Sequence, residues 1–430
     1  MGRTGVMEEA TMTTRRHRNG PIGPLLLLLG IAMLLTGSTP ALARQTGSHG
    51  ATTDANGWHV AHERVLDVDG EPLSLSPDGQ WIAGLGPDRA FCVWDVDDLA
   101  PVCANDRYPI DTRSMAWAPD STAVAFSLDF ARLFTESDIF VFDIDRESLA
   151  NLTDDGIDDD IPITELSDAT EPVPVDVYPA WSLDGNELTF ARTAWAAETR
   201  TTTLMTVSVT GGEPTELIEL ETDVPLPINS PMRWLDDGSL LYTIWTSVPD
   251  EADDGLWNYN PGDEPVQLLE GTKANDYPVP IVTDVIERNG ATIALGFSPL
   301  LVSQYTQDPE RSVGFTLDLE TGDIGSLEAF AGIDNSGLGI GEQTQIIAPA
   351  RIAPDGLTLI LGIGQLGTGT LAIAEAGTGE SPLSIGLEPR SLPLAAFHGY
   401  AWASNDTILV PLTEGQVVLL TLERPTQAPA

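Results

Sequence analysis

The sequence predicts an all-β fold, a seven-bladed β-propeller closed by an N-terminal strand in the last blade. Three observations in the sequence predict it. A short turn motif recurs seven times, apolar strand-like runs accompany each copy, and the last copy is one strand short while an unpaired strand-like run lies near the N-terminus. A chain of 430 residues is long enough for such a repeat array.

The turn motif first appears as "LSPDG", which begins at Leu75. The matching positions in the later copies are Trp117, Trp181, Trp234, Ile286, Ile352 and Trp402. Proline presets φ for a tight turn, and aspartate hydrogen-bonds its own backbone there. Four short strands in a unit of about 45 residues with insertions indicate a propeller rather than a helical solenoid. Units five and six match the pattern less well, so six and eight blades stay open as alternatives.

Residues 1–43 have the pattern of a signal peptide. "TRRHRNG" (14–20) is the positive segment, "PIGPLLLLLGIAMLL" (21–35) the apolar core and "ALA" (41–43) the cleavage site. We expect cleavage after Ala43 and export to the periplasm, the cell wall or the medium. The pair Arg15 and Arg16 leaves both the general secretory route and the twin-arginine route open. Residues 44–57 are expected to form a disordered linker before a propeller that spans residues 58–424.

Residues 58–68, "WHVAHERVLDV", predict the first strand, and the first repeat unit follows it. This unit contains Cys92 and Cys103, the two cysteines of the chain, on either side of a hairpin that we expect to turn at Asp97 and Asp98. Such a turn places the cysteines directly opposite each other, close enough for a disulfide in an oxidising compartment. We therefore expect a structural disulfide, with two free thiols as the alternative.

The later units repeat the same order of strand, tight turn and strand. The expected strands are 114–118, 122–127, 138–143 and 149–153 in unit two, 177–182, 187–192, 203–209 and 215–220 in unit three, 231–234, 240–245, 255–260 and 266–271 in unit four, 291–297 and 313–318 in unit five, 357–363 and 370–376 in unit six, and 400–404, 407–412 and 416–423 in unit seven. Residues 425–430 are expected to form a flexible tail. The strand at 58–68 then completes unit seven as its outer edge, which removes an exposed sheet edge.

The repeat resembles that of TolB-like propellers, a relative of the WD repeat, in a chain of exported bacterial type. The resemblance rests on "WAPDS", "WSLDG" and "WLDDG", each followed by an apolar strand, and on the closing "NLT". It covers roughly residues 58 to 425 and implies the propeller fold, but not a function, because this fold hosts many activities. The tryptophans that recur in the motif, Trp117, Trp181, Trp234 and Trp402, predict packing between blades.

Two kinds of catalytic site find little support in the sequence. Propellers of the prolyl-oligopeptidase type carry a hydrolase domain with a G-x-S-x-G motif, and the chain has neither the motif nor room for the domain. The TolB-like lyases use several histidines around a metal, whereas the mature chain has His49, His59, His62 and His398. On a regular strand His59 and His62 point to opposite faces. We therefore expect no enzyme activity and no histidine-bound metal.

The acidic insertion between units two and three is the calcium candidate. Its oxygen-rich run contains Asp154, Asp155, Asp158, Asp159 and Asp160, but it lacks the spacing of an EF-hand loop. A solvated acidic loop is the simpler interpretation. We expect no cofactor, with calcium as the alternative.

Trp195, Trp245 and Tyr305 are the candidate binding aromatics. Each follows a second strand of its unit, where a propeller presents one of its faces. They could bind a sugar or a peptide, although aromatic residues are also common in ordinary loops.

The charge of the chain limits the class of partner. There are 65 acidic and 20 basic residues, a net charge of −45 that becomes −47 once residues 1–43 are removed. Binding of nucleic acid needs clustered Lys and Arg, so neither nucleic acid nor, after signal cleavage, a membrane is an expected partner. We expect a monomer.

The leading hypothesis is an exported, non-catalytic binding or scaffold module for a protein, a peptide or a cell-envelope component. The alternative is a propeller enzyme of the lactonase, lyase or glycosidase type, with calcium held by an acidic pore. A purely structural module without a ligand is a third, weaker hypothesis that the sequence does not separate from the first.

Overall fold

The computed structural model describes residues 58–105, 107–129, 136–156, 172–195, 200–220, 227–228, 230–245, 253–271, 279–288, 290–298, 314–333, 345–365, 368–376, 382–385, 400–412 and 415–423. All of them belong to one unit, Gly50–Ala430. The expected signal peptide (1–43), linker (44–57) and tail (425–430) lie outside the described residues, as does residue 424 at the expected end of the propeller.

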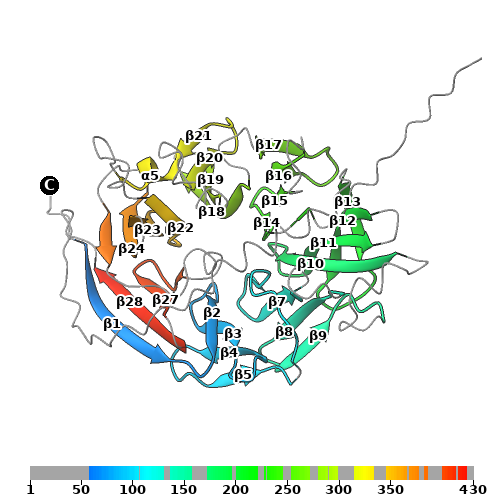
Figure 1. The fold of residues 1–430 in the computed structure, drawn as a ribbon, viewed down its shortest axis with the longest axis horizontal. Helices are drawn as coiled ribbons and strands as arrows, with labels where there is room; N and C mark the ends of the chain where they lie inside the picture. Colours follow the sequence, from blue (N-terminus) through cyan, green and yellow to red (C-terminus); the bar gives the residue numbers. More distant parts are fainter. Residues whose placement is uncertain are drawn as a thin grey trace, which may run out of the picture. The chain divides into compact units, whose positions relative to one another are not determined.

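Within the described residues the strands form seven antiparallel four-stranded sheets, the blades of a β-propeller (Figure 1). The predicted fold class and the count of seven blades are confirmed. The first strands, closest to the centre of the ring, are β2 (Glu71–Leu75), β6 (Ala116–Trp117), β10 (Val173–Trp181), β14 (Arg233–Trp234), β18 (Ile281–Arg288), β22 (Gln345–Ile352) and β26 (Ala401–Trp402). The second strands are β3 (Trp81–Leu85), β7 (Ala123–Ser127), β11 (Glu187–Trp195), β15 (Leu240–Ile244), β19 (Ala291–Phe297), β23 (Thr358–Gln365) and β27 (Thr407–Pro411).

The outer half of each blade holds its third and fourth strands. The third strands are β4 (Phe91–Asp95), β8 (Ile139–Asp143), β12 (Arg200–Ser208), β16 (Gly255–Tyr259), β20 (Gly314–Asp318), β24 (Thr368–Glu375) and β28 (Gln416–Glu423). The fourth strands are β5 (Pro101–Cys103), β9 (Ser148–Asn151), β13 (Thr215–Leu220), β17 (Val266–Glu270), β21 (Ile324–Ser326), β25 (Leu383–Ile385) and β1 (His59–Asp67). A one-turn helix that the sequence did not predict, α5 (Leu327–Phe330), follows β21 and is N-capped by Ser326.

The ring closes as predicted, because β1 is the fourth strand of the last blade (Figure 1, blue beside red). It pairs antiparallel with β28, with Val65 opposite Val418 and Leu66 opposite Val417. The N-terminal strand thus covers the edge that β28 would otherwise expose.

The hairpin of blade 1 is also as predicted. Cys92 lies opposite Cys103, and Trp94 lies opposite Pro101. The two cysteines form a disulfide between β4 and β5. This staple spans 11 residues and fixes a fourth strand that is only three residues long.

The recurring turn and tryptophan have separate structural roles. In the first copy Asp78 accepts hydrogen bonds from the Ser76 hydroxyl (2.6 Å) and from the backbone of Gln80, and Gly79 adopts φ 73° against the backbone of Ala403 in the neighbouring blade. The tryptophans donate their indole N–H to the preceding blade, Trp117 to Ser74, Trp181 to Ala116, Trp234 to Thr189 and Trp402 to Arg351, at 2.8–3.1 Å. The expected blade-to-blade packing is confirmed.

Candidate functional site

The two faces of the propeller differ in the length of their connections. We call the face where first strands begin and second strands end the loop face, and the opposite one the turn face. Turn-face connections contain two to seven residues, whereas the loop-face connection from Asn151 to Val173 contains 21 and that from Phe297 to Gly314 contains 16. Because long loops on a rigid scaffold carry most binding residues, the loop face is the candidate functional surface.

A cavity of about 420 Å³ opens on the loop face between blades 1 and 2. Its size falls within the range of small ligand pockets. Blade 1 contributes three lining residues and blade 2 four: Glu71, Leu85 and Arg89 from the first, and Pro109, Ile110, Thr112 and Asp129 from the second. The cavity therefore combines an apolar wall with two carboxylates and one guanidinium.

The blade 2 wall of this cavity is fixed by backbone hydrogen bonds. Ile110 forms a β-bridge with Leu128, the amide of Asp129 donates to the carbonyl of Pro109 (2.6 Å), and the amide of Asp111 donates to the carbonyl of Ser127 (2.9 Å). Leu85 and Ile110 of the lining also belong to the buried core between blades 1 and 2. The cavity is thus built before any ligand arrives.

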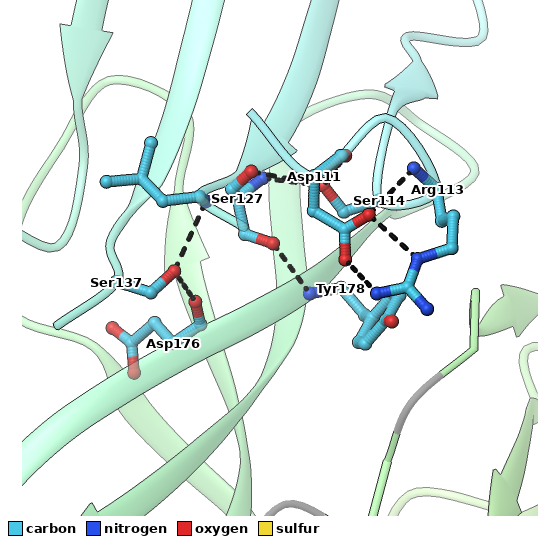
Figure 2. A network of polar contacts seen from close by, with 8 residues as sticks. Asp111, Arg113, Ser114, Ser127, Ser137, Asp176 and Tyr178 are labelled. Carbon is cyan, nitrogen blue, oxygen red and sulfur yellow. Dashed lines mark hydrogen bonds and ion pairs between the residues drawn. The ribbon is translucent and has the colours of Figure 1, made fainter. Parts of the chain in front are cut away.

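A polar network beside the cavity ties this wall to blade 3 (Figure 2). Asp111 accepts two hydrogen bonds from the Arg113 guanidinium, at 2.9 and 2.8 Å, and only 8% of its side chain is exposed. Ser114 donates to the Asp111 carbonyl, and Ser137 donates to the carbonyl of Asp176 on β10. Bidentate Arg–carboxylate pairs have a fixed geometry, so the network holds the connection before β6 in one position.

Tyr178 completes the network from a β-bulge in β10. The register shifts between Val177 and Ala180, and Tyr178 adopts φ 54°, which is rare for a residue with a bulky side chain. Burial and the Asp111 carboxylate, which accepts from the phenol, raise the pKa of Tyr178 well above its ordinary value. The bulge therefore brings the buried hydroxyl of Tyr178 to Asp111.

Deeper in blade 3, Asp176 and Arg192 form a second bidentate pair, at 2.8 and 2.6 Å. These residues are directly opposite on β10 and β11. Burial raises the pKa of Asp176 above its usual range, and the Arg192 hydrogen bonds oppose that rise. The pair holds a carboxylate with 1% exposure inside the sheet.

A third charged group links the first strands of blades 4, 5 and 6. Asp284 accepts from Arg233 (3.0 Å) and from the amide of Ile352 (2.9 Å), and Arg351 donates to the carbonyl of Thr283. Burial lowers the pKa of Arg351, and the Asp284 carboxylate counteracts the shift. One carboxylate and two guanidiniums thus connect three consecutive blades near the axis of the ring.

The candidate aromatics lie on two adjacent blades. Trp195 ends β11, and half-buried Trp245 directly follows β15, with its amide bonded to the carbonyl of Pro227. Both positions are on the loop face, as the sequence predicts. Tyr305 lies outside the described residues, and the binding role of all three stays a prediction.

The calcium candidates are only partly described. Asp154 accepts from the amide of Gly156 (2.9 Å), and the charge of Asp155 acts on the pair Asp176 and Arg192. Asp158, Asp159 and Asp160 lie outside the described residues. Within the part of the chain that the structure describes, no three His, Cys, Asp or Glu side chains gather as metal ligands would.

The expectation for the N-terminal histidines is wrong in one respect. A bulge between Val60 and His62 places His59 opposite Glu423 and His62 opposite Thr421. Since residues two apart on a strand share a face, the two histidines lie on the same side of the sheet, not on opposite sides. The His59 ring contacts the Glu423 carboxylate at 3.2 Å. His49 and His398 lie outside the described residues.

The sequence reasoning missed the residues that line the cavity and form its network. Glu71, Arg89, Asp111 and Asp129 lie in three different connections and at one strand end, with no spacing that joins them. The signal that would have found them is the small number of arginines, because seven of the described arginines form ion pairs with carboxylates.

Comparisons with known proteins show the fold. An oligogalacturonate lyase from Vibrio parahaemolyticus is 10% identical, with a TM-score of 0.52 over 86% of this chain and 96% of its own. An oligogalacturonate lyase in complex with manganese is 12% identical, with a TM-score of 0.49 over 87% and 96%. TolB from Acinetobacter baumannii is 14% identical, with a TM-score of 0.41 over 76% and 66%.

At these identities, the likeness to solved structures establishes a β-propeller and nothing about activity. The match with a TM-score of 0.52 agrees with the propeller fold that the TolB-like resemblance implied. No protein-family model matches the chain, and no curated protein matches it.

Proposed function

We propose that this protein is an exported, non-catalytic binding module that holds a protein, a peptide or a cell-envelope component on its loop face. The difference between the two faces carries the proposal. The long connections and the preformed cavity lie on the loop face, while short turns cover the turn face. A rigid ring that presents variable loops on one face suits recognition of a partner.

Export is supported by two features. The disulfide between Cys92 and Cys103 persists in oxidising compartments, and the N-terminal sequence has the three parts of a signal peptide. None of the described helices has the length and apolar character that crossing a lipid bilayer requires.

The partner that suits this surface is not a nucleic acid, because the net charge of −45 repels phosphate. The protein would act as a monomer, since the closed ring pairs the strand edge at β28 within the chain. These partner assignments are part of the proposal.

Site-specific cross-linking tests the proposal. Both native cysteines form the disulfide, so an introduced cysteine is the one reactive thiol. Asp88→Cys places a photo-cross-linker on the loop face, and Asp145→Cys places it on the turn face; both parent residues are exposed. In cells that express the protein, we expect a discrete adduct from Asp88→Cys that unlabelled protein competes away. Equal adducts from both positions, or none from either, would contradict the proposal.

The enzyme alternative requires carboxylates from several blades to converge on the axis and hold calcium. The one described group near the axis that spans three blades contains two arginines and a single carboxylate, Asp284. Nothing in the described residues favours the enzyme over the binding module.

A further inference from the structure

We propose that the cavity between blades 1 and 2 binds the lysine or arginine side chain of a partner protein, and that Arg89 pairs with the Glu71 carboxylate there until the partner arrives. This inference rests on the proposed binding function of the loop face and names the chemistry that the face recognises.

The lining has the two parts that a long basic side chain requires. Pro109 is exposed and offers the apolar surface of the lining, while Leu85 and Ile110 behind it are 3% and 6% exposed. Glu71 and Asp129 contribute carboxylates to the same cavity. Lys and Arg bury an apolar stem while their charged head meets an acceptor, so the combination fits them.

The charge balance excludes an anionic ligand. Glu71 and Asp129 contribute two negative charges to the lining, and Arg89 contributes one positive charge. The nearby guanidinium of Arg113 is bonded through two nitrogens to Asp111, and the charge of Asp129 acts on it as well, so these two carboxylates share one cation. The cavity therefore keeps a net negative charge, and the field of a chain with a charge of −45 attracts a basic partner toward it.

Arg89 is held loosely enough to be displaced. Its guanidinium lies 3.9 Å from the Glu71 carboxylate, and 66% of its side chain is exposed. Exposed ion pairs of this kind contribute little to stability. A partner cation that also packs its stem on the exposed Pro109 would replace Arg89 at Glu71.

The blade 2 side of the cavity is held rigidly by backbone hydrogen bonds. The amide of Asp129 is bonded to the carbonyl of Pro109, and Ile110 is bridged to Leu128. The network of Asp111 and Tyr178 fixes the same segment from the other side (Figure 2). A site that needs no ordering on binding loses less conformational entropy.

The test compares three short peptides that differ at one position, Gly-Gly-Lys-Gly-Gly, its norleucine analogue and its glutamate analogue, by calorimetric titration of the mature chain. We expect binding of the lysine peptide only. Glu71→Gln and Asp129→Asn should each weaken it about tenfold, the loss of one charge-assisted hydrogen bond. Arg89→Gln should tighten it several-fold, because it removes the internal competitor.

Matched controls separate the cavity from general attraction to an acidic surface. Asp145→Asn removes an exposed carboxylate from the turn face, and Arg146→Gln removes an arginine that is paired with Asp143 there. Both should bind the lysine peptide as the parent does. Circular dichroism confirms that every variant is folded.

Two results would overturn the inference. The first is equal weakening by Asp145→Asn and Glu71→Gln, and the second is unchanged affinity in Arg89→Gln. The proposed function fails separately, because the cross-linking at Asp88→Cys does not use the peptide. If the Asp88→Cys adduct still forms when Glu71→Gln or Asp129→Asn is added, the cavity is not the binding site, but the proposed binding function is retained.

Discussion

Closure of the ring by β1 predicts that a disulfide at Val65 and Val418 will staple the whole propeller. These residues are directly opposite on β1 and β28. The arrangement copies the native Cys92–Cys103 pair, which joins the third and fourth strands of blade 1. The double variant Val65→Cys with Val418→Cys should therefore form the cross-link on folding.

The magnitude follows from the length of chain that the staple closes. In the chain-entropy model the 11-residue native loop contributes about 3 kcal/mol, whereas a loop of roughly 350 residues contributes about 6 kcal/mol. Val418 is fully buried, so its replacement costs about 1 kcal/mol, while Val65 is 48% exposed and costs little. A net gain of about 4 to 5 kcal/mol in the free energy of unfolding remains. At about 2.1 cal/mol/K per residue this raises Tm by roughly 5 °C.

The assay is calorimetry of the oxidised double variant beside the two single variants, with peptide mapping under non-reducing conditions to locate the bond. The single variants control for the lost valine contacts. Free thiols at 65 and 418 in the folded double variant would refute the closure. If the cross-link forms but Tm does not rise, the argument that it stabilises the propeller by restricting the unfolded chain would be refuted.

Three further predictions concern blade 1 and the polar network. Replacing Cys92 and Cys103 by alanine should lower the free energy of unfolding by about 3 kcal/mol, measured by urea denaturation; a change below 1 kcal/mol would contradict a structural role. Asp111→Asn should cost about 2 kcal/mol, less than the roughly 3 to 5 kcal/mol for a fully buried ion pair, because a third of the Arg113 side chain is exposed. An unchanged urea midpoint would count against the network. Burial and Asp111 raise the pKa of Tyr178, so the unfolded chain loses this proton first and stability falls as pH rises above about 10. Tyr178→Phe should make that fall shallower in urea titrations from pH 8 to 11, and equal slopes would contradict the assignment.

Local sequence was enough for much of the fold because the propeller repeats short-range rules. The turn at Asp78 forms within five residues, and the opposition of Cys92 and Cys103 follows from counting outward from one turn. The closure by β1 follows from a count as well, since the last unit lacks a strand and the first strand lacks a partner.

The strand ends on the loop face could not be read in the same way. The sequence predicts strands at 177–182 and 187–192, but β10 and β11 extend to nine residues each. The added segments are 173–176 and 193–195, and Asp176 is the one charged residue in them. Cross-strand pairing of Asp176 with Arg192 makes that extension favourable, and the sequence does not show that the two residues are opposite.

The cavity was not predicted for a related reason, the large excess of acidic over basic residues. With 65 acids and 20 bases, an acidic run such as 154–160 is the ordinary state of this surface and says little about a site. Basic residues are much rarer than acidic ones, so the positions of the basic residues say more about where a site lies. Arg113, Arg192 and Arg233 all pair with carboxylates on or beside first strands. Arg89 differs from these three arginines, because its ion pair with Glu71 is long and exposed. The pair lies in a cavity that Asp129 also lines. Arginines are few in this chain, yet Arg89 is held only weakly by Glu71. This is the physical argument that a cation from a partner binds at the site.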